Sequence, residues 1–311
     1  MKRKLMATLL AATMATSMMV GATAMAEEDI TVILITMDSI DQHWIGVDTG
    51  AKTAAEELGV NYQFMAPDKK DDAQQIERVN NAIAAGADAI MIAANGPDAI
   101  VAALEEAQAE GIKIIYVDSP ANLEAEATFS TNNEAAGTTA GEQMLAELEA
   151  QGITEGKIGI VNANSATDTA IKREAGFRAA FEGTDFEILE TQYGEGDTAK
   201  SQEIADNYIT EGCVGIFGCN EGSTVGVGNA IKGNGGGIVG VGFDKSDSIL
   251  SLIKDGSLLC TMAQNPDVMG YEGMYAAVAA VKGEEIPETQ VDTGVSVLTA
   301  EALAEMATEA E

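Results

Sequence analysis

The sequence has few residues that could support metal, disulfide or cofactor chemistry. Among its 311 residues are one histidine and three cysteines, Cys213, Cys219 and Cys260. They form neither a Cys-x-x-Cys pair nor a Cys/His cluster, so we predict no metal site and no disulfide framework, with the three thiols buried and free. No Gly-x-Ser-x-Gly elbow occurs. The glycine-rich stretch 233–237 follows a helix and precedes a strand, the reverse of a phosphate-binding loop, so no cofactor is predicted.

Basic residues are also scarce. The chain has 17 Lys and Arg against 50 Asp and Glu, for a formal net charge of −33. A surface of this sign repels nucleic acid and anionic lipid, so no nucleic-acid partner is expected. The acidic residues are spread along the chain, which is typical of a solvated surface rather than a disordered acidic tail.

Long apolar runs are missing everywhere except at the N-terminus. Lys2, Arg3 and Lys4 precede an uncharged apolar stretch over residues 5–20, and Ala24-Met25-Ala26 supplies a small-x-small cleavage pattern. This predicts a cleaved signal peptide over residues 1–26; the alternative, a membrane anchor, is disfavoured because the run is short and contains Thr and Ser. No Cys stands at the cleavage site for lipidation. We therefore expect an unanchored protein, either periplasmic or secreted.

Beyond the leader, β-branched apolar runs alternate with amphipathic helical segments, which predicts an α/β fold with parallel sheets. In the first half we predict strands over 30–35, 61–65, 89–92 and 113–117, with helices over 44–58, 72–85 and 97–110. In the second half we predict helices over 134–150, 169–181, 198–210, 223–232, 246–254 and 266–282, and strands over 157–161, 187–191, 214–218, 237–241 and 259–263. The halves share one element order and predict two similar Rossmann-like lobes. Residues 119–133 lack strong periodicity and are interpreted as a crossing segment.

Nearly every predicted strand ends in polar side chains. The ends include Asp38 to Asp41, Asn95, Asp118-Ser119, Asn162 to Asn164, Asn220-Glu221, Asp244 and Gln264-Asn265. Ligands of open parallel sheets bind at the carboxyl ends of the strands, so these side chains are candidates for one site. Carboxylates and amides bind hydroxyl groups, and an aromatic face covers the C–H side of a ring. The pattern favours a neutral, polyhydroxylated ligand.

Four short motifs then occur in a defined order: Arg173-Glu-Ala-Gly-Phe177, Cys219-Asn-Glu221, Val241-Gly-Phe-Asp244 and Ala263-Gln-Asn-Pro266. With them the chain resembles the ribose- and galactose-binding periplasmic proteins, the pentose/hexose group of type I solute-binding proteins. The resemblance covers essentially residues 29–300. It implies that the ligand is held by nine residues: Asp41, His43, Trp44, Asn95, Asp118, Arg173, Asn220, Asp244 and Gln264.

The same resemblance implies a hinged clamp with no catalytic activity. One lobe would comprise residues 27–131 plus 265–292, and the other residues 132–264 plus 293–311, joined by a three-segment hinge. The closed clamp would deliver a sugar or polyol to a membrane ABC permease, and we expect it to act as a monomer.

Several positions depart from the ribose-binding pattern. Ser119 replaces an arginine, and His43 and Trp44 replace two aromatics. Gly196 stands where the group has an aromatic residue, although Tyr193 is near. The resemblance therefore implies a small sugar or polyol rather than ribose in particular.

Two other classes of protein share parts of this pattern. A ligand-sensing receptor subunit, for chemotaxis or a sensor kinase, would use the same clamp. A sugar isomerase or hydrolase would need an acid/base pair, for which Asp118 and Asp244 are candidates, but no nucleophile or metal set accompanies them. A repressor on this fold is excluded because the chain has an export signal and lacks DNA-binding helices.

Overall fold

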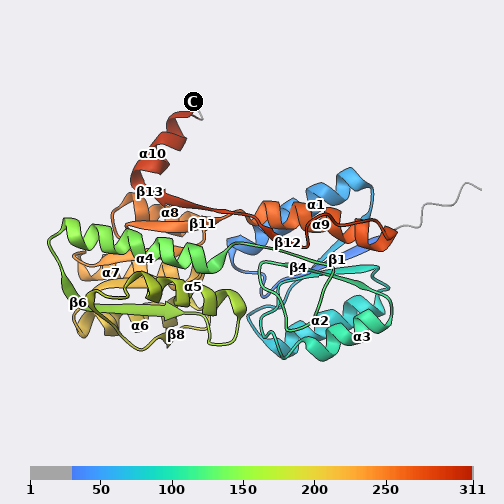
Figure 1. Cartoon of the computed structure of the whole chain (residues 1–311), viewed down its shortest axis with the longest axis horizontal. Helices are drawn as coiled ribbons and strands as arrows, with labels where there is room; N and C mark the ends of the chain where they lie inside the picture. The colour runs from blue at the N-terminus through green and yellow to red at the C-terminus, as the bar shows by residue number, and fades with distance from the viewer. Residues whose placement is uncertain (1–29, 310–311) are drawn as a thin grey trace, which may run out of the picture.

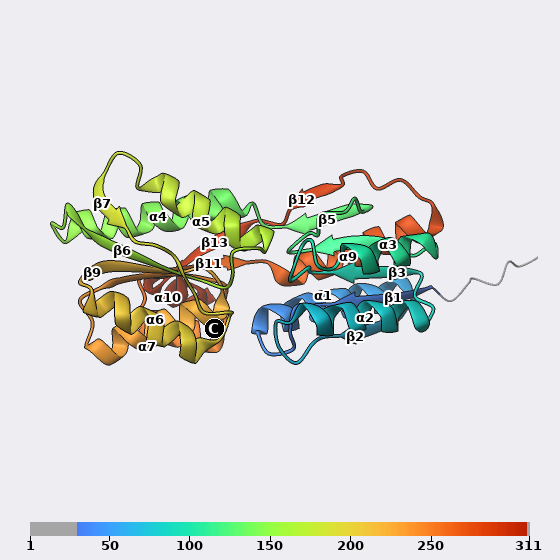
Figure 2. The same cartoon turned by 90° about the horizontal axis from the view of Figure 1, so that it is seen from below.

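The computed structural model describes residues 30–309, so the predicted signal peptide lies outside the described residues. The chain forms two lobes that lie side by side along the long axis of the molecule (Figure 1). Each lobe is a twisted sheet between two layers of helices, which are seen in Figure 1 for the first lobe and in Figure 2 for the second. The predicted α/β class with two similar lobes is confirmed.

The sheet of the first lobe has six strands, all parallel, in the order β12-β5-β4-β3-β1-β2. Their bounds are β1 Thr31–Ile35, β2 Asn61–Met65, β3 Ala89–Ile92, β4 Lys113–Val117, β5 Ala127–Ser130 and β12 Gln290–Asp292. Side chains alternate across β1: Val32 and Leu34 face one core, and Ile33 and Ile35 face the other. A strand buried on both faces has no polar side, which explains its continuous apolar sequence.

Helices α1 (Gln42–Leu58) and α9 (Pro266–Lys282) cover one face of this sheet, and α2 (Asp72–Ala84) and α3 (Val101–Ala109) cover the other. Helix α9 is distant from α1 in the sequence, yet the two pack against each other. The first lobe therefore takes a late segment of the chain into its core.

The second sheet has the order β13-β11-β10-β9-β6-β7, with β8 also paired to β6, and only β13 runs antiparallel. The bounds are β6 Glu155–Asn162, β7 Asp185–Ile188, β8 Gln192–Tyr193, β9 Cys213–Gly218, β10 Val239–Phe243, β11 Cys260–Gln264 and β13 Val295–Thr299. Helices α4 (Asn133–Ala150) and α5 (Asp168–Ala180) cover one face; α6 (Thr198–Thr210), α7 (Glu221–Asn234) and α8 (Asp247–Lys254) cover the other. Helix α10 (Ala300–Glu309) projects from this lobe.

The chain passes between the two sheets three times. It leaves the first sheet after β5 and enters α4, returns after β11 into α9, and leaves again between β12 and β13. Asn265 Nδ2 donates to the carbonyl of Thr293 at 2.8 Å, so two of the passages are bonded to each other. Three adjacent, short passages are typical of a hinge.

Beyond residue 282 we predicted no helix or strand, and the structure forms β12, β13 and α10 there. In the preceding part of the chain, two strand predictions differ from the structure. The segment predicted to be a featureless crossing contains β5, whose four residues are too few to show a period. The predicted strand 187–191 is instead two strands, β7 and β8, that pair with successive parts of β6. Both differences arise because strand pairing, rather than local pattern, decides these edge segments.

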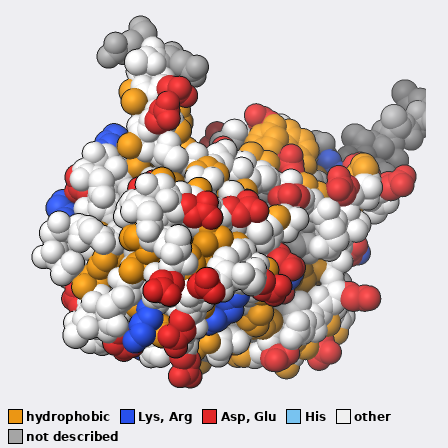
Figure 3. Space-filling view, turned by 60° about the vertical axis from the view of Figure 1, so that its left-hand side comes forward, with side chains coloured by type: hydrophobic (Ala, Val, Ile, Leu, Met, Phe, Trp, Pro, Cys, Tyr) orange, Lys and Arg blue, Asp and Glu red, His pale blue; other side chains and the backbone are white. Residues whose placement is uncertain are grey.

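On the face of the molecule shown in Figure 3, acidic side chains are scattered rather than gathered in one block. The three cysteine side chains are buried and free. Within residues 30–309, every helix is too short or too polar to cross a membrane.

Candidate functional site

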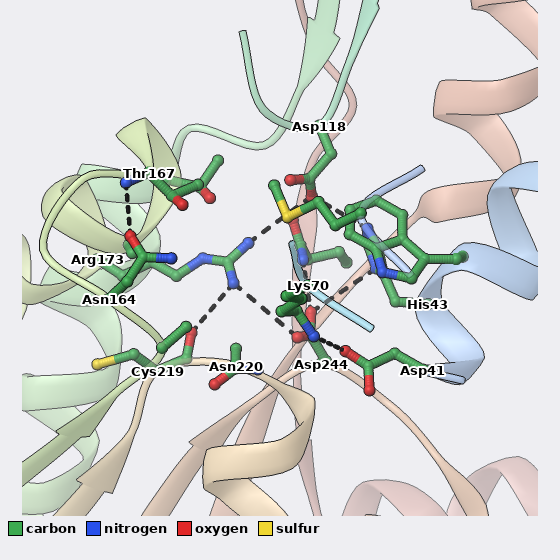
Figure 4. Close-up of a pocket in the computed structure, with 16 residues that line it drawn as sticks. Asp41, His43, Lys70, Asp118, Asn164, Thr167, Arg173, Cys219, Asn220 and Asp244 are labelled. Atoms are coloured by element: carbon green, nitrogen blue, oxygen red, sulfur yellow. Dashed lines mark hydrogen bonds and ion pairs between the residues drawn. The ribbon is translucent and has the colours of Figure 1, made fainter. Parts of the chain in front are cut away.

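A cavity of about 40 Å³ lies between the lobes at the carboxyl ends of the strands (Figure 4). It is lined by Met37, Asp41, His43, Trp44, Lys70, Asp118, Ala163, Asn164, Thr167, Thr169, Ala170, Arg173, Cys219, Asn220, Asp244 and Gln264. Pockets for small molecules usually measure ~300–1,000 Å³. A sugar-sized molecule therefore fits here only when the lobes or their side chains move apart.

Asp118 and Asp244 occupy equivalent places in the two lobes, directly after β4 and β10. Each backbone N–H donates to the neighbouring strand, Asp118 to Phe129 O at 2.8 Å and Asp244 to Met262 O at 2.9 Å. Both residues have a left-handed backbone conformation, with φ of 63° for Asp118 and 73° for Asp244. Among residues 30–309, the only other non-glycine residue with positive φ is Glu195. Such backbone costs about 1–3 kcal/mol and tends to occur at functional sites.

Further hydrogen bonds fix the carboxylate of Asp244. Its Oδ2 accepts from the N–H of Glu221 at 2.8 Å, and its Oδ1 accepts from Nε2 of Gln264. The first bond comes from the N-terminus of α7, which favours negative charge. Asp244 is thus held in one orientation by two neighbouring strand ends.

Arg173 enters the cavity from α5 because α4 and α5 approach each other closely. A Cβ at Gly176 would lie 2.0 Å from the carbonyl oxygen of Glu134, so only glycine permits this contact. The approach places Arg173 Nε 2.7 Å from Oδ1 of Asn133, the first residue of α4. Nη1 donates to the carbonyl of Cys219 at 3.0 Å.

The guanidinium of Arg173 lies between the two carboxylates. Nη2 is 3.8 Å from Asp118 Oδ2 and Nη1 is 3.9 Å from Asp244 Oδ2. Its Cζ also lies 3.8 Å from the ring centroid of Phe243, which gives a cation–π contact. The buried charges are therefore paired, as their desolvation requires.

His43 occupies a second position between the same carboxylates. Nε2 is 3.0 Å from Asp118 Oδ2, although its N–H is not aligned for a hydrogen bond, and Nδ1 is 3.7 Å from Asp244 Oδ1. Burial lowers the pKa of His43, but the adjacent carboxylates outweigh it and raise the pKa above 6.5. Burial likewise raises the pKa of Asp118, and His43 and Arg173 outweigh it, so that pKa is lowered.

Trp44 and Asp41 line the cavity near His43. The indole of Trp44 meets the His43 ring edge to face at 4.7 Å between centroids, and its Nε1 donates to Asp38 Oδ2 at 3.3 Å. Asp41 accepts from Lys70 Nζ at 2.6 Å. Trp44 thus combines a fixed indole N–H with an apolar face at the cavity wall.

Asn220 and Gln264 each leave one buried polar atom free for a ligand. Asn220 Oδ1 caps α7 by accepting from Ser223 N at 3.4 Å. Its Nδ2 and the Oε1 of Gln264 have no hydrogen-bond partner among the described residues. An unpaired buried amide costs about 1–3 kcal/mol, so these two atoms indicate where a bound molecule would bond.

Eight of the nine residues predicted from the sequence line the cavity; the exception is Asn95. Its Nδ2 donates to Asp72 Oδ1, so the side chain is turned towards α2. Its carbonyl accepts from Thr167 Oγ1 of the other lobe at 2.7 Å, so Asn95 contributes a contact between lobes.

The cavity also contains polar residues that we did not predict, namely Lys70, Asn164, Thr167 and Thr169. Asn164 was visible as part of a polar strand end. Lys70 gave no such signal, because it lies in the loop after β2, beside the exposed Lys69, and an adjacent lysine pair resembles an ordinary solvated surface.

Three further contacts hold the lobes together around the cavity. The N–H of His43 donates to Glu221 Oε2 at 3.2 Å, and Ser119 Oγ lies 3.0 Å from Thr169 Oγ1. On the rim, the N–H of Asp247 donates to Gln42 Oε1 at 3.1 Å. The structure is therefore a closed arrangement of the two lobes.

The site as a whole offers fixed acceptors, fixed donors and an aromatic wall. The carboxylates of Asp41, Asp118 and Asp244 accept hydrogen bonds, Arg173 donates them, and the side-chain amides of Asn220 and Gln264 can do both. Within the described residues, no group of three or more His, Cys, Asp or Glu side chains is placed to hold a metal ion. Such a set can orient a hydroxylated molecule through many hydrogen bonds.

Comparisons with known proteins agree with this geometry. The family model described as periplasmic binding protein domain matches residues 32–285. The ribose import binding protein RbsB of Haemophilus influenzae is 25% identical over 90% of this chain and 94% of its own length. That of Salmonella typhimurium is 27% identical over 92% and 95%.

A solved structure from Agrobacterium radiobacter, a carbohydrate transporter solute binding protein in complex with D-arabinose, is 28% identical with a TM-score of 0.86. It covers 92% of this chain and 99% of its own. An Agrobacterium vitis ABC transporter solute binding protein with bound D-fucose is also 28% identical, with a TM-score of 0.83 over 90% and 98%. With the family model spanning most of its length, this chain belongs to the periplasmic binding protein family.

Proposed function

We propose that the protein captures a small sugar or sugar-like polyol between its lobes and delivers it to an ABC-type permease. One observation carries the proposal: Asp118 and Asp244 converge from equivalent strand ends of the two lobes, in left-handed backbone, on one cavity. Because each lobe supplies one carboxylate, a ligand that bonds to both joins the lobes. Binding then shifts the population towards the closed form.

The chemistry of the cavity supports a neutral, hydroxylated ligand. The orphaned Asn220 Nδ2 and Gln264 Oε1 provide one donor and one acceptor, and the carboxylates accept from hydroxyl groups. Trp44 offers an apolar face for a sugar ring. Relatives named as ribose- and D-allose-binding proteins, and similar solved structures with bound D-arabinose and D-fucose, support the same class of ligand.

We propose that this capture takes place outside the cytoplasm, without catalysis and by a monomer. The basic and apolar leader over residues 1–26, followed by a cleavage pattern and no lipidation Cys, supports an exported and unanchored protein. Arg173 cannot act as a base at ordinary pH, and the carboxylates are committed to hydrogen bonds or ion pairs. A bound sugar is expected to be recovered unchanged.

Thermal unfolding with a panel of sugars tests the proposal. D-ribose, D-allose, D-arabinose, D-fucose and D-tagatose are added in turn to the wild type and to two variants, Asp244→Ala and Arg173→Ala. At least one sugar should raise the wild-type Tm, and either variant should lose at least ~30-fold in affinity, because removing one partner of a buried charge pair costs about 2–5 kcal/mol. Lys172→Ala, next to Arg173 but half exposed, is the matched control. Undiminished stabilisation of both variants would refute the site.

A further inference from the structure

Lys70 reaches the cavity from a loop of the first lobe, where Figure 4 shows its ammonium group beside the carboxylate of Asp41. Its Nζ lies 2.7 Å from Asp38 Oδ2 and 2.6 Å from Asp41 Oδ2, and its side chain is 14% exposed. An ammonium group has three N–H donors. Asp38 and Asp41 take up two of these N–H donors, so one N–H remains for a further acceptor.

Asp38 ties the position of Lys70 to the rest of the site. Its Oδ1 accepts from the N–H groups of Ile40 and Asp41 at 2.8 and 3.0 Å, which shapes the turn before α1. Its Oδ2 also accepts from Trp44. The carboxylate that positions the aromatic wall therefore also positions the ammonium.

The ammonium stays charged in this setting. Burial lowers the pKa of Lys70, but Asp41 and Asp38 outweigh it and raise the pKa above its ordinary value. Together the three groups carry one negative charge, so they favour a neutral hydroxylated molecule over an acidic one.

Lys70 lies next to Gly196 of the opposite lobe, in the loop between β8 and α6. Gly196 has φ +74°, and a Cβ there would lie 2.8 Å from Lys70 Nζ and 3.0 Å from its Cδ. The same loop packs closely against α7, since a Cβ at Gly222 would lie 1.9 Å from the carbonyl oxygen of Gly196. A side chain at residue 196 would therefore collide with Lys70 in the position that Lys70 takes between the closed lobes.

We propose that Lys70 is a specificity-determining residue of the sugar site, and that it reaches its working position over Gly196 when the lobes close. The remaining N–H of Lys70 donates to a ligand hydroxyl, and Asp41 beside it accepts from the next hydroxyl. This proposal rests on the proposed function only for the identity of the ligand. The contact between Lys70 and Gly196 is a property of the closed protein alone.

A double-mutant cycle without any sugar tests that contact. Spin labels are attached at Asn80→Cys in α2 and Asp206→Cys in α6, two exposed positions on different lobes, and the interlobe distance distribution is measured by pulsed EPR. Gly196→Ala should enlarge the open population several-fold when Lys70 is present and much less in Lys70→Ala. The backbone strain of alanine at this φ is common to both backgrounds and cancels. Equal effects in the two backgrounds would overturn the contact.

The choice of sugar tests specificity. Dissociation constants of the five panel sugars are measured for wild type, Lys70→Met and Lys69→Met, the last being a neighbouring lysine whose side chain is 71% exposed. Lys70→Met should weaken the sugars unequally, by about tenfold for those that present the contacted hydroxyl, and so change their order of affinity. If Lys70→Met weakened the affinity for all five sugars by the same factor, the role of Lys70 would be merely structural and the proposal would be overturned. If none of the five sugars binds the wild type, the proposed function fails, whereas the cycle still decides the contact.

Discussion

At the scale of single residues, the polar strand ends made much of the site predictable. Asp118, Asp244 and Gln264 could be found because each follows a buried strand, where a polar side chain must have a partner. The left-handed backbone of Asp118 and Asp244 could not be predicted, because the sequence does not show the φ of an aspartate. Asn95 has the same sequence context as the others, yet its side chain turns to Asp72. Its direction depends on a rotamer that packing with α2 decides.

Glu221 makes stability depend on pH. Burial, with the negative charges of Asp41 and Asp244, raises the pKa of Glu221 to about 7, against the backbone N–H groups of Gln42 and His43, which lower it. A carboxyl with a raised pKa binds its proton more tightly in the folded state, so its contribution falls as pH rises from about 4.5 to about 7. The full change is on the order of 3 kcal/mol.

Between pH 4.5 and 7.5, the Tm of Glu221→Gln should therefore fall less than the Tm of the wild type. Calorimetric scans of wild type and variant across this range measure it, and Glu203→Gln, an exposed glutamate on α6, is the control. Parallel Tm curves for wild type and Glu221→Gln would contradict the assignment. His43 is present in all three proteins, so its own titration does not affect the difference.

At the scale of elements, hydrophobic periodicity located most helices and strands, including the edge strand β2, but it missed three short strands. The central strands are apolar because both faces are covered, and that pattern is local. By contrast, β5, β12 and β13 are short strands at or near the sheet edges that exist because a neighbouring strand offers hydrogen bonds. The close packing of α4 on α5 could not be predicted either, because a glycine such as Gly176 within a helix indicates only low helix propensity.

That packing leads to a prediction at Gly176. Gly176→Ala should destabilise the protein by about 1–3 kcal/mol, because its Cβ would lie 2.0 Å from Glu134 O and force α5 away from α4. The same shift should move Arg173 and weaken sugar binding. Chemical denaturation and titration calorimetry measure the two effects.

Gly233→Ala provides the comparison, since Gly233 lies in α7 and a Cβ added there would have no neighbouring atom within 4 Å. It should be neutral or slightly stabilising, because alanine favours the helix. If both glycine variants behaved alike, the close approach of α4 and α5 would not be what positions Arg173.

At the scale of the whole molecule, the repeated element order predicted two lobes, and the polar strand ends predicted a site between them. The degree of closure could not be predicted, because it depends on contacts between residues far apart in sequence, such as His43 with Glu221 and Ser119 with Thr169. These contacts surround a cavity of only about 40 Å³. A ligand must therefore enter an open form and be enclosed by closure.

The most direct test of the clamp is the distance between the lobes with and without sugar. With labels at Asn80→Cys and Asp206→Cys, the sugar that most stabilises the wild type should convert a mixed distribution into one short distance. Asp244→Ala should keep the mixed distribution at the same sugar concentration. A sugar that binds the wild type and leaves the interlobe distances unchanged would contradict the account.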